Sequence, residues 1–241
     1  MGRLVSTLDR RLYPDHSERG IHAHFRNRIL SRLTPDSVML DLGAGRGFRP
    51  AMDFRGCAAR ICGVDLDPCV LENPCLDEAK LLDSPTFPYP DATFDVVVSD
   101  NVLEHLDDPV VVFREVARVL KPGGLFLAKT PNRWHYVPVL ATLTPDAFHK
   151  FYNERLGRKA EDTYPTRYRA NSARAVRRIA GEAGLEVVEV EHFEGRPDYL
   201  RISAPTYVAG WLYERVVNAS TLLRGVRLVL IIELRRPENH S

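Results

Sequence analysis

The stretch Val38-Met39-Leu40-Asp41-Leu42-Gly43-Ala44-Gly45-Arg46-Gly47 decides the fold of this chain, because an apolar run passes through an acid into three glycines on alternate positions. Glycine has no Cβ, so such a loop brings backbone N–H groups close to a ligand. A second apolar run, Ile61-Cys62-Gly63-Val64-Asp65, also ends in an acid, and an acid there suits the two hydroxyls of a ribose. The pattern predicts a nucleoside site, with a helix after the glycines whose N-terminus favours anions.

The spacing of the glycines indicates which nucleoside cofactor is bound. Dinucleotide folds use Gly-x-Gly-x-x-Gly, whereas this chain has Asp-x-Gly-x-Gly-x-Gly. Further motifs follow in order at residues 81–84, 86–91, 93–99, 103–106 (Leu-Glu-His-Leu) and 118–124 (Arg-Val-Leu-Lys-Pro-Gly-Gly). Together, over about residues 36–132, they resemble the class I S-adenosylmethionine-dependent methyltransferases of the methyltransferase type 11 branch. The resemblance implies an enzyme that transfers a methyl group and uses S-adenosylmethionine as its cofactor.

The order of the expected elements predicts an α/β fold. Buried strands are expected near residues 38–42, 61–65, 94–99 and 125–129, and they alternate with helices at about 50–60 and 109–120. This alternation is typical of a doubly wound, mostly parallel sheet. The resemblance implies a seven-stranded Rossmann-like methyltransferase sheet, completed by an antiparallel C-terminal pair at about 185–192 and 226–234.

The chain is interpreted as a single methyltransferase domain over residues 1–241. Residues 1–34 are expected to form an N-terminal helical cover, 36–132 the cofactor-binding core, and 133–170 a substrate-lid insertion with a helix near 145–156. Residues 171–241 are expected to hold a helix up to about 183 and the strand pair, with a long connection at 194–225.

Composition limits the partners of the chain. The 241 residues carry a net charge of +1, which gives no overall attraction to nucleic acid or to an anionic membrane. No apolar run reaches the roughly 18 residues needed to span a bilayer, and the N-terminus lacks the apolar region of a secretion signal. The spacing of Cys57, Cys62, Cys69 and Cys75 does not favour zinc or disulfides, so no metal is expected. A cytoplasmic protein is predicted, with peripheral membrane contact left open.

The resemblance assigns the cofactor-binding residues. The glycine loop would support the methionine half of the cofactor, Asp41 would place its amino group, and Asp65 would accept its ribose hydroxyls. Leu66 would lie beside the adenine face, and Asp83 and Ser84 near the adenine amino group. The alternatives are turn glycines and solvated acids at strand ends. The complete predicted set is Asp41, Gly43, Ala44, Gly45, Gly47, Asp65, Leu66, Asp83, Ser84 and Asn101.

Catalysis is predicted to need little beyond positioning, because the donor is already activated. His105 is the candidate general base if the acceptor must lose a proton, and bracing of the turn by Glu104 and His105 is the alternative. The insertion contributes candidate acceptor-binding residues, each of which can equally be structural: His135, Tyr136, His149 and Tyr152.

The predicted acceptor is a small molecule or a lipid-like compound. RNA is an alternative that the near-zero charge and the lack of a recognisable RNA-binding module do not favour. A regulatory protein that binds the cofactor without catalysis is another alternative, and a nicotinamide-dependent oxidoreductase is disfavoured by the glycine spacing. Residues 205–224, with Trp211 and Arg215, form an apolar segment that suits a membrane surface, or else a helix packed over the last two strands or against a second subunit.

Overall fold

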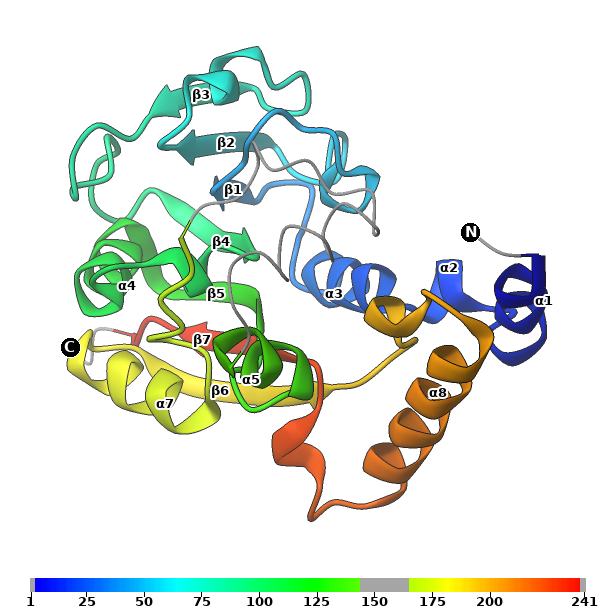
Figure 1. Ribbon diagram of the computed structural model, residues 1–241. Coiled ribbons are helices and arrows are strands. Elements are labelled where there is room, and N and C mark those ends of the chain that lie inside the picture. The colour runs from blue at the N-terminus through cyan, green and yellow to red at the C-terminus, as the bar shows by residue number, and fades with distance from the viewer. Residues whose placement is uncertain (1–2, 144–164, 239–241) are drawn as a thin grey trace. The chain divides into compact units, whose positions relative to one another are not determined.

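The computed structural model describes residues 3–143 and 165–238 of the chain (Figure 1). The chain forms two compact units. The first contains Met1–His24, Pro131–Pro165 and His192–Val229, and the second contains Phe25–Thr130, Thr166–Glu191 and Leu230–Ser241.

A seven-stranded sheet in the order β3-β2-β1-β4-β5-β7-β6 organises the fold (Figure 1). Pairing is parallel from β3 through β5. At the other side of β5, Gly123 N–H donates to Arg236 O and Arg236 N–H donates to Gly124 O, which is the reciprocal pattern of an antiparallel pair. The predicted mostly parallel sheet with an antiparallel C-terminal pair is therefore confirmed. The strands are β1 (Val38–Leu42), β2 (Arg60–Asp65), β3 (Glu78–Leu81), β4 (Phe94–Asp100), β5 (Leu120–Pro131), β6 (Glu186–Phe193) and β7 (Val229–Arg235).

Apolar runs in the central strands build the core of the second unit. A strand covered on both faces has no reason to alternate apolar and polar residues, and β4 follows this rule, with four consecutive buried residues from Val96 to Ser99. Leu40, Val97 and Phe126 belong to one buried cluster that also takes side chains from the helices.

Two helices that pack into the buried cluster beside the sheet begin and end where the sequence predicts. Helix α4 (Pro109–Val119) is capped by the Asp108 side chain, which accepts hydrogen bonds from the N–H groups of Val110 and Val111. Helix α7 (Ala173–Glu182) is capped by Ser172 and is followed by Gly184 at φ +75°. The two helices pack against each other.

The prediction of a helix over residues 50–60 is wrong. Only a short 3-10 turn, η1 (Pro50–Met52), follows the glycine loop. The Asp53 side chain accepts a hydrogen bond from Arg55 N–H, and Gly56 has φ +75°, so the backbone turns away from helical geometry. Phe54 is nevertheless fully buried, with the Arg26 guanidinium over its ring. Two further 3-10 turns are η2 (Pro68–Glu72) and η3 (Leu103–His105).

The N-terminal segment is helical, as predicted, but in three pieces: α1 (Arg3–Leu12), α2 (His16–Arg19) and α3 (Ile21–Leu30). Pro14 interrupts the first two because it has no N–H to donate. Phe25 and Ile29 of α3 are fully buried, so this helix packs into the core.

Among the described residues, the first unit also holds α5 (Tyr136–Leu143), η5 (Asp198–Leu200), α8 (Ala204–Ala219) and η6 (Arg224–Val226). A capping box between Ser203 and Thr206 begins α8, so the long connection predicted at 194–225 contains a regular helix. The helix predicted near 145–156 lies outside the described residues. Within the described ranges, no helix combines the length and apolar character that crossing a membrane requires.

Candidate functional site

The glycine loop after β1 has backbone geometry that strongly favours glycine. Gly43, Gly45 and Gly47 have φ values of +80°, +52° and +75°. A Cβ on Gly43 would lie 2.2 Å from Val102 Cγ2, and one on Gly47 would lie 2.2 Å from Asn73 Oδ1. Among the described residues, no atom outside the neighbouring loop positions lies within 4 Å of the Cβ position of Gly45. The loop is thus packed at both ends and open in the middle, where a ligand has room.

Asn73 holds this loop in place. Its Nδ2 donates to Ala44 O at 3.1 Å and to Gly45 O at 3.0 Å, while its Oδ1 accepts from Cys75 N–H at 2.9 Å. Sequence analysis missed Asn73. Nothing in the local sequence distinguishes it from an ordinary turn residue, because its partners lie far back along the chain.

Asp65 ends β2 directly beside the loop. Its Oδ2 accepts a hydrogen bond from Gly45 N–H, and its Oδ1 accepts one from Asp67 N–H, both at 2.9 Å. A carboxylate has about four lone-pair sites, so both oxygens can still accept from ligand hydroxyls. The next residue, Leu66, is largely exposed and presents an apolar surface at the same edge.

Three further predicted residues follow the carboxyl ends of neighbouring strands. Leu82 N–H donates to Asp65 O at 2.8 Å, which places Asp83 and Ser84 close to the end of β2. Asn101 follows β4 at φ +59°, and its N–H donates to Lys129 O at 2.9 Å. Because adjacent parallel strands end at one edge of a sheet, the predicted cofactor residues are gathered there, which is where α/β sheets bind ligands.

A buried charge cluster lies beneath the loop. Asp41 is buried in β1, and Asp100 is held between Lys129 Nζ at 2.8 Å and Arg49 Nη1 at 3.3 Å. Burial, together with the negative charges of Asp100 and Asp65, raises the pKa of Asp41 to about 7. Burial lowers the pKa of Lys129, and the charge of Asp100 opposes that change. The site therefore contains more buried carboxyl groups than buried cationic side chains.

Sequence analysis missed Arg49, Asp100 and Lys129. The available signal was a lysine within the apolar run Leu125-Phe126-Leu127-Ala128-Lys129, because a charged side chain in a central strand needs a partner. The register pairs Asp100 with Lys129 across β4 and β5. That pairing could not be read from the sequence alone.

We expect Asp41→Asn to stabilise the folded chain at about pH 8 and to stabilise it less than half as much at about pH 5. The folded pKa of about 7 lies above the ordinary value of 3.8, so the wild-type chain loses stability as the pH rises between these values. The difference sets an upper limit on the order of 4 kcal/mol for the gain. Urea unfolding at both pH values measures it, and an equal change at the two would contradict the assignment.

Glu104 and His105 belong to η3, just after β4. Glu104 is buried, and its Oε2 accepts a hydrogen bond from Thr130 Oγ1 at 2.9 Å, which in turn accepts one from Asn171 Nδ2 at 2.7 Å. Burial raises the pKa of Glu104. His105 Nε2 lies 3.9 Å from Glu104 Oε1, and the imidazole is partly exposed. A fixed carboxyl group thus stands behind a histidine that solvent can reach.

The predicted acceptor residues are only partly described, since His149 and Tyr152 lie outside the described residues. In the first unit, the ring centroids of His135 and Tyr136 are 4.0 Å apart, and His135 Nε2 lies 3.5 Å from Glu194 Oε2. Burial lowers the pKa of His135 to about 4 and raises that of Glu194 to about 8. His135 is 1% exposed, which argues against direct contact with an acceptor. The acceptor role of Tyr136 stays a prediction.

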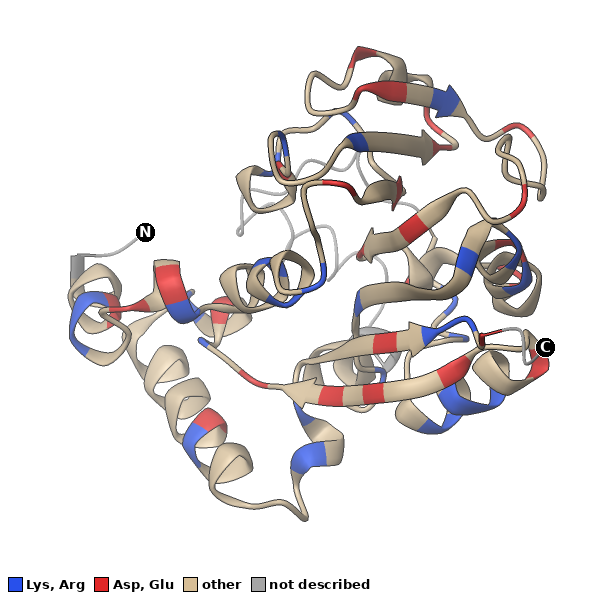
Figure 2. Cartoon of the chain, turned by 180° about the vertical axis from the view of Figure 1, so that it is seen from behind, with Lys and Arg blue, Asp and Glu red and all other residues tan. Residues whose placement is uncertain are grey.

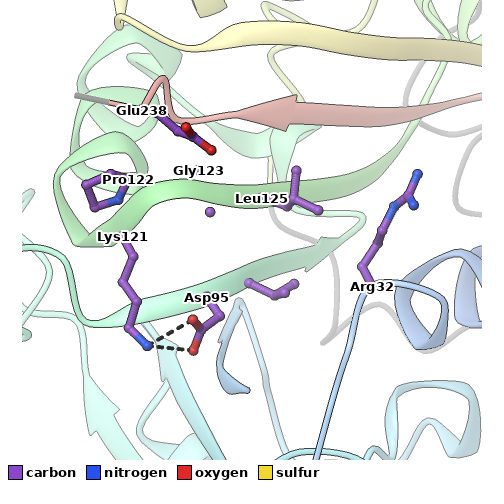
Figure 3. Close-up of a pocket in the computed structure, with 9 residues that line it drawn as sticks. Arg32, Asp95, Lys121, Pro122, Gly123, Leu125 and Glu238 are labelled. Atoms are coloured by element: carbon purple, nitrogen blue, oxygen red, sulfur yellow. Dashed lines mark hydrogen bonds and ion pairs between the residues drawn. The ribbon is translucent and has the colours of Figure 1, made fainter. Parts of the chain in front are cut away.

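A hollow of about 380 Å³ lies elsewhere in the second unit, at the amino-terminal ends of β4 and β5 (Figure 3). Lys121 Nζ contacts both carboxylate oxygens of Asp95, and Arg32 pairs with Glu233. This end of the sheet is opposite to the glycine loop, and two of the charged groups that line the hollow, Lys121 and Asp95, pair with each other. In the part of the chain that is described, no three His, Cys, Asp or Glu side chains are grouped to hold a metal.

The comparisons with known proteins agree with this geometry. A family model described as a methyltransferase domain matches residues 15–190. A probable S-adenosylmethionine-dependent methyltransferase of Mycobacterium tuberculosis is 36% identical over 125 residues, which cover 48% of this chain and 43% of that protein. A 2-methyl-6-phytyl-1,4-hydroquinone methyltransferase of Synechocystis is 28% identical over 120 residues, covering 47% and 38%. The matched part thus spans less than half the length of these curated relatives.

A solved structure supports the fold across the whole chain. It contains a methyltransferase in complex with the Trm112 methyltransferase activator of Haloferax volcanii, with a TM-score of 0.62, 19% identity and 99% coverage of both chains. The class I fold and the cofactor S-adenosylmethionine, both predicted from the sequence, are confirmed by these matches. The chain belongs to the methyltransferase domain family.

Proposed function

We propose that the chain catalyses methyl transfer from S-adenosylmethionine to a small-molecule or lipid-like acceptor by in-line displacement. The observation that carries the proposal is the open glycine loop above a buried, acid-rich cluster. The raised pKa of Asp41 means that its ionised form lacks sufficient positive charge nearby. A ligand with a cationic end relieves this deficit, and S-adenosylmethionine carries both an ammonium and a sulfonium group.

In this proposal, the residues at the sheet edge bind different parts of the cofactor. The loop of Gly43, Ala44, Gly45 and Gly47 supports the methionine half, with Asp41 near its amino group and Asn101 at the neighbouring strand end. Asp65 accepts the ribose hydroxyls. Leu66, Asp83 and Ser84 hold the adenine. The exposure of Leu66 and the spare acceptor capacity of Asp65 support these roles.

His105 is proposed as the base for acceptors that must lose a proton. Bound S-adenosylmethionine supplies a methyl group that its sulfonium already activates. The chain has to align the acceptor, exclude water and take up the proton, and alignment is worth about 7–11 kcal/mol in favourable cases. The partly exposed imidazole can receive that proton, and the Glu104 carboxyl group behind it stabilises the resulting charge.

A small or lipid-like acceptor is preferred over RNA on two grounds. The net charge of +1 offers little attraction for a polyanion. The relative from Synechocystis is named for a phytyl hydroquinone, which is a lipid-like acceptor. A regulatory protein that binds the cofactor without catalysis remains the alternative from another functional class.

A transfer assay with methyl-labelled S-adenosylmethionine tests the proposal against three acceptor pools: a lipid extract, a small-molecule extract and total RNA. We expect label in one of the first two. Asp65→Ala should reduce transfer by weakening cofactor binding by about 1–3 kcal/mol, whereas Asp91→Ala, at an exposed acid elsewhere in the second unit, should not. Label in RNA alone would contradict the acceptor class. Cofactor binding in calorimetry without transfer to any pool would favour the regulatory alternative.

A further inference from the structure

Helix α8 is apolar on two opposite faces. One face packs into the first unit through Tyr207, Gly210, Glu214 and Val217, which are buried. The other carries Val208, Leu212 and Val216, which are 38%, 52% and 58% exposed. These three lie at i, i+4 and i+8 and so form one stripe along the helix. A helix that is apolar all round normally has both faces covered, so the outer face of α8 has the character of a contact surface.

The apolar surface continues into the loop after the helix. Leu222 is 93% exposed, and its neighbour Leu223 is 38% exposed. A leucine that stands out this far from a loop contacts few other atoms of its own chain, and burying it elsewhere gains about 1.5–3 kcal/mol. We call Val208, Leu212, Val216, Leu222 and Leu223 together the α8 surface.

The charge around the α8 surface is positive. Along residues 204–228 the charged side chains are Glu214, Arg215, Arg224 and Arg227. The acid is buried, accepts hydrogen bonds from Tyr13 and Asn218, and has its Oε2 3.3 Å from Arg215 Nε, so it offsets part of one positive charge. Arg215 and Arg224 are exposed at the surface. Figure 2 shows α8 free of charge apart from one acidic and one basic position, with basic residues in η6 and just after it.

We propose that the α8 surface docks on an anionic lipid bilayer. Its leucines and valines enter the boundary between headgroups and acyl chains, and Arg215 and Arg224 contact lipid phosphates. A bilayer needs no shaped pocket to receive a protruding leucine, which suits Leu222. A second copy of the chain fits less well, because a two-fold contact through this surface brings like-charged arginines together. This inference does not depend on the proposed methyl transfer.

Vesicle co-sedimentation of the full chain tests the proposal, with phosphatidylcholine vesicles made with and without phosphatidylglycerol. We expect the wild-type chain to sediment with the anionic vesicles, to stay in the supernatant with phosphatidylcholine alone, and to be released by salt. Leu212→Ser/Leu222→Ser should lower the partition coefficient about tenfold or more. Arg224→Gln should lower it about fivefold.

The matched control is Leu71→Ser/Val188→Ser, which removes two other exposed aliphatic side chains and should leave sedimentation unchanged. Circular dichroism and thermal unfolding verify that each variant is folded. The proposal is overturned if the wild-type chain ignores anionic vesicles, or if the Leu212/Leu222 variant binds them like wild type. Light scattering that shows a dimer lost in that variant, without vesicle binding, also overturns it and assigns the surface to self-association.

Discussion

Replacing His105 with Ala is expected to lower kcat on an identified acceptor by about 10²–10⁴, which is the usual contribution of a positioned general base. The expectation rests on two linked hydrogen bonds that hold the Glu104 carboxyl group beside the imidazole. Asn171 donates to Thr130, Thr130 donates to Glu104, and Glu104 Oε1 lies 3.9 Å from His105 Nε2. A carboxyl group held in this way can stabilise an imidazolium without moving.

Two measurements separate catalysis from bracing. The affinity of His105→Ala for S-adenosylhomocysteine should equal that of wild type, because the histidine is not assigned to the cofactor. Glu104→Gln keeps the hydrogen bond from Thr130 but removes the negative charge, so it should lower kcat less than the loss of the imidazole does. Turnover that survives in His105→Ala would show that the histidine only completes the η3 turn.

Replacing Lys129 with Met is expected to destabilise the chain by about 3–5 kcal/mol, the cost of leaving one partner of a buried ion pair alone. Lys129 is 1% exposed, and its Nζ lies 2.8 Å from Asp100 Oδ1. Without the ammonium group, Asp100 keeps Arg49 at 3.3 Å, but that arginine is largely exposed and screened by water. Asp41 would then lie close to the carboxylate of Asp100, whose negative charge would be less compensated.

The same two strands supply the matched control for this prediction. Lys121 and Asp95 pair at 2.8 Å at the other end of β4 and β5, where their side chains are 42% and 35% exposed. Lys121→Met should cost less than about 1 kcal/mol. Lys129→Met/Asp100→Asn should recover much of the lost stability, since it removes the uncompensated charge. Urea unfolding of wild type and these three variants measures the differences in stability. Equal midpoints for Lys129→Met and wild type would refute the role of the pair.

The sites where sequence analysis failed share one physical feature. The helix expected over residues 50–60 is absent because the Asp53 side chain and Gly56 turn the backbone, while Phe54 is drawn into the core. Arg26 of α3 also donates hydrogen bonds to Ala51 O and Asp53 O, so contacts with a distant part of the chain add to these local turns in outweighing the helical propensity of the segment. Asn73 and Lys129 were missed for the related reason that their partners are distant in the chain.

The sequence by itself determined the α/β class, the parallel strands, the glycine loop with Asp65 and the cofactor. The fold features follow from local patterns, since an apolar run marks a buried strand and alternate glycines mark a tight loop. The cofactor was implied by the resemblance of the ordered motifs to a methyltransferase family. Only the tertiary structure decided that Asp100 pairs with Lys129, that Asn73 holds the loop, and that the outer face of α8 is exposed. Burial and charge pairing depend on which strands become neighbours, and that is settled when the whole core packs.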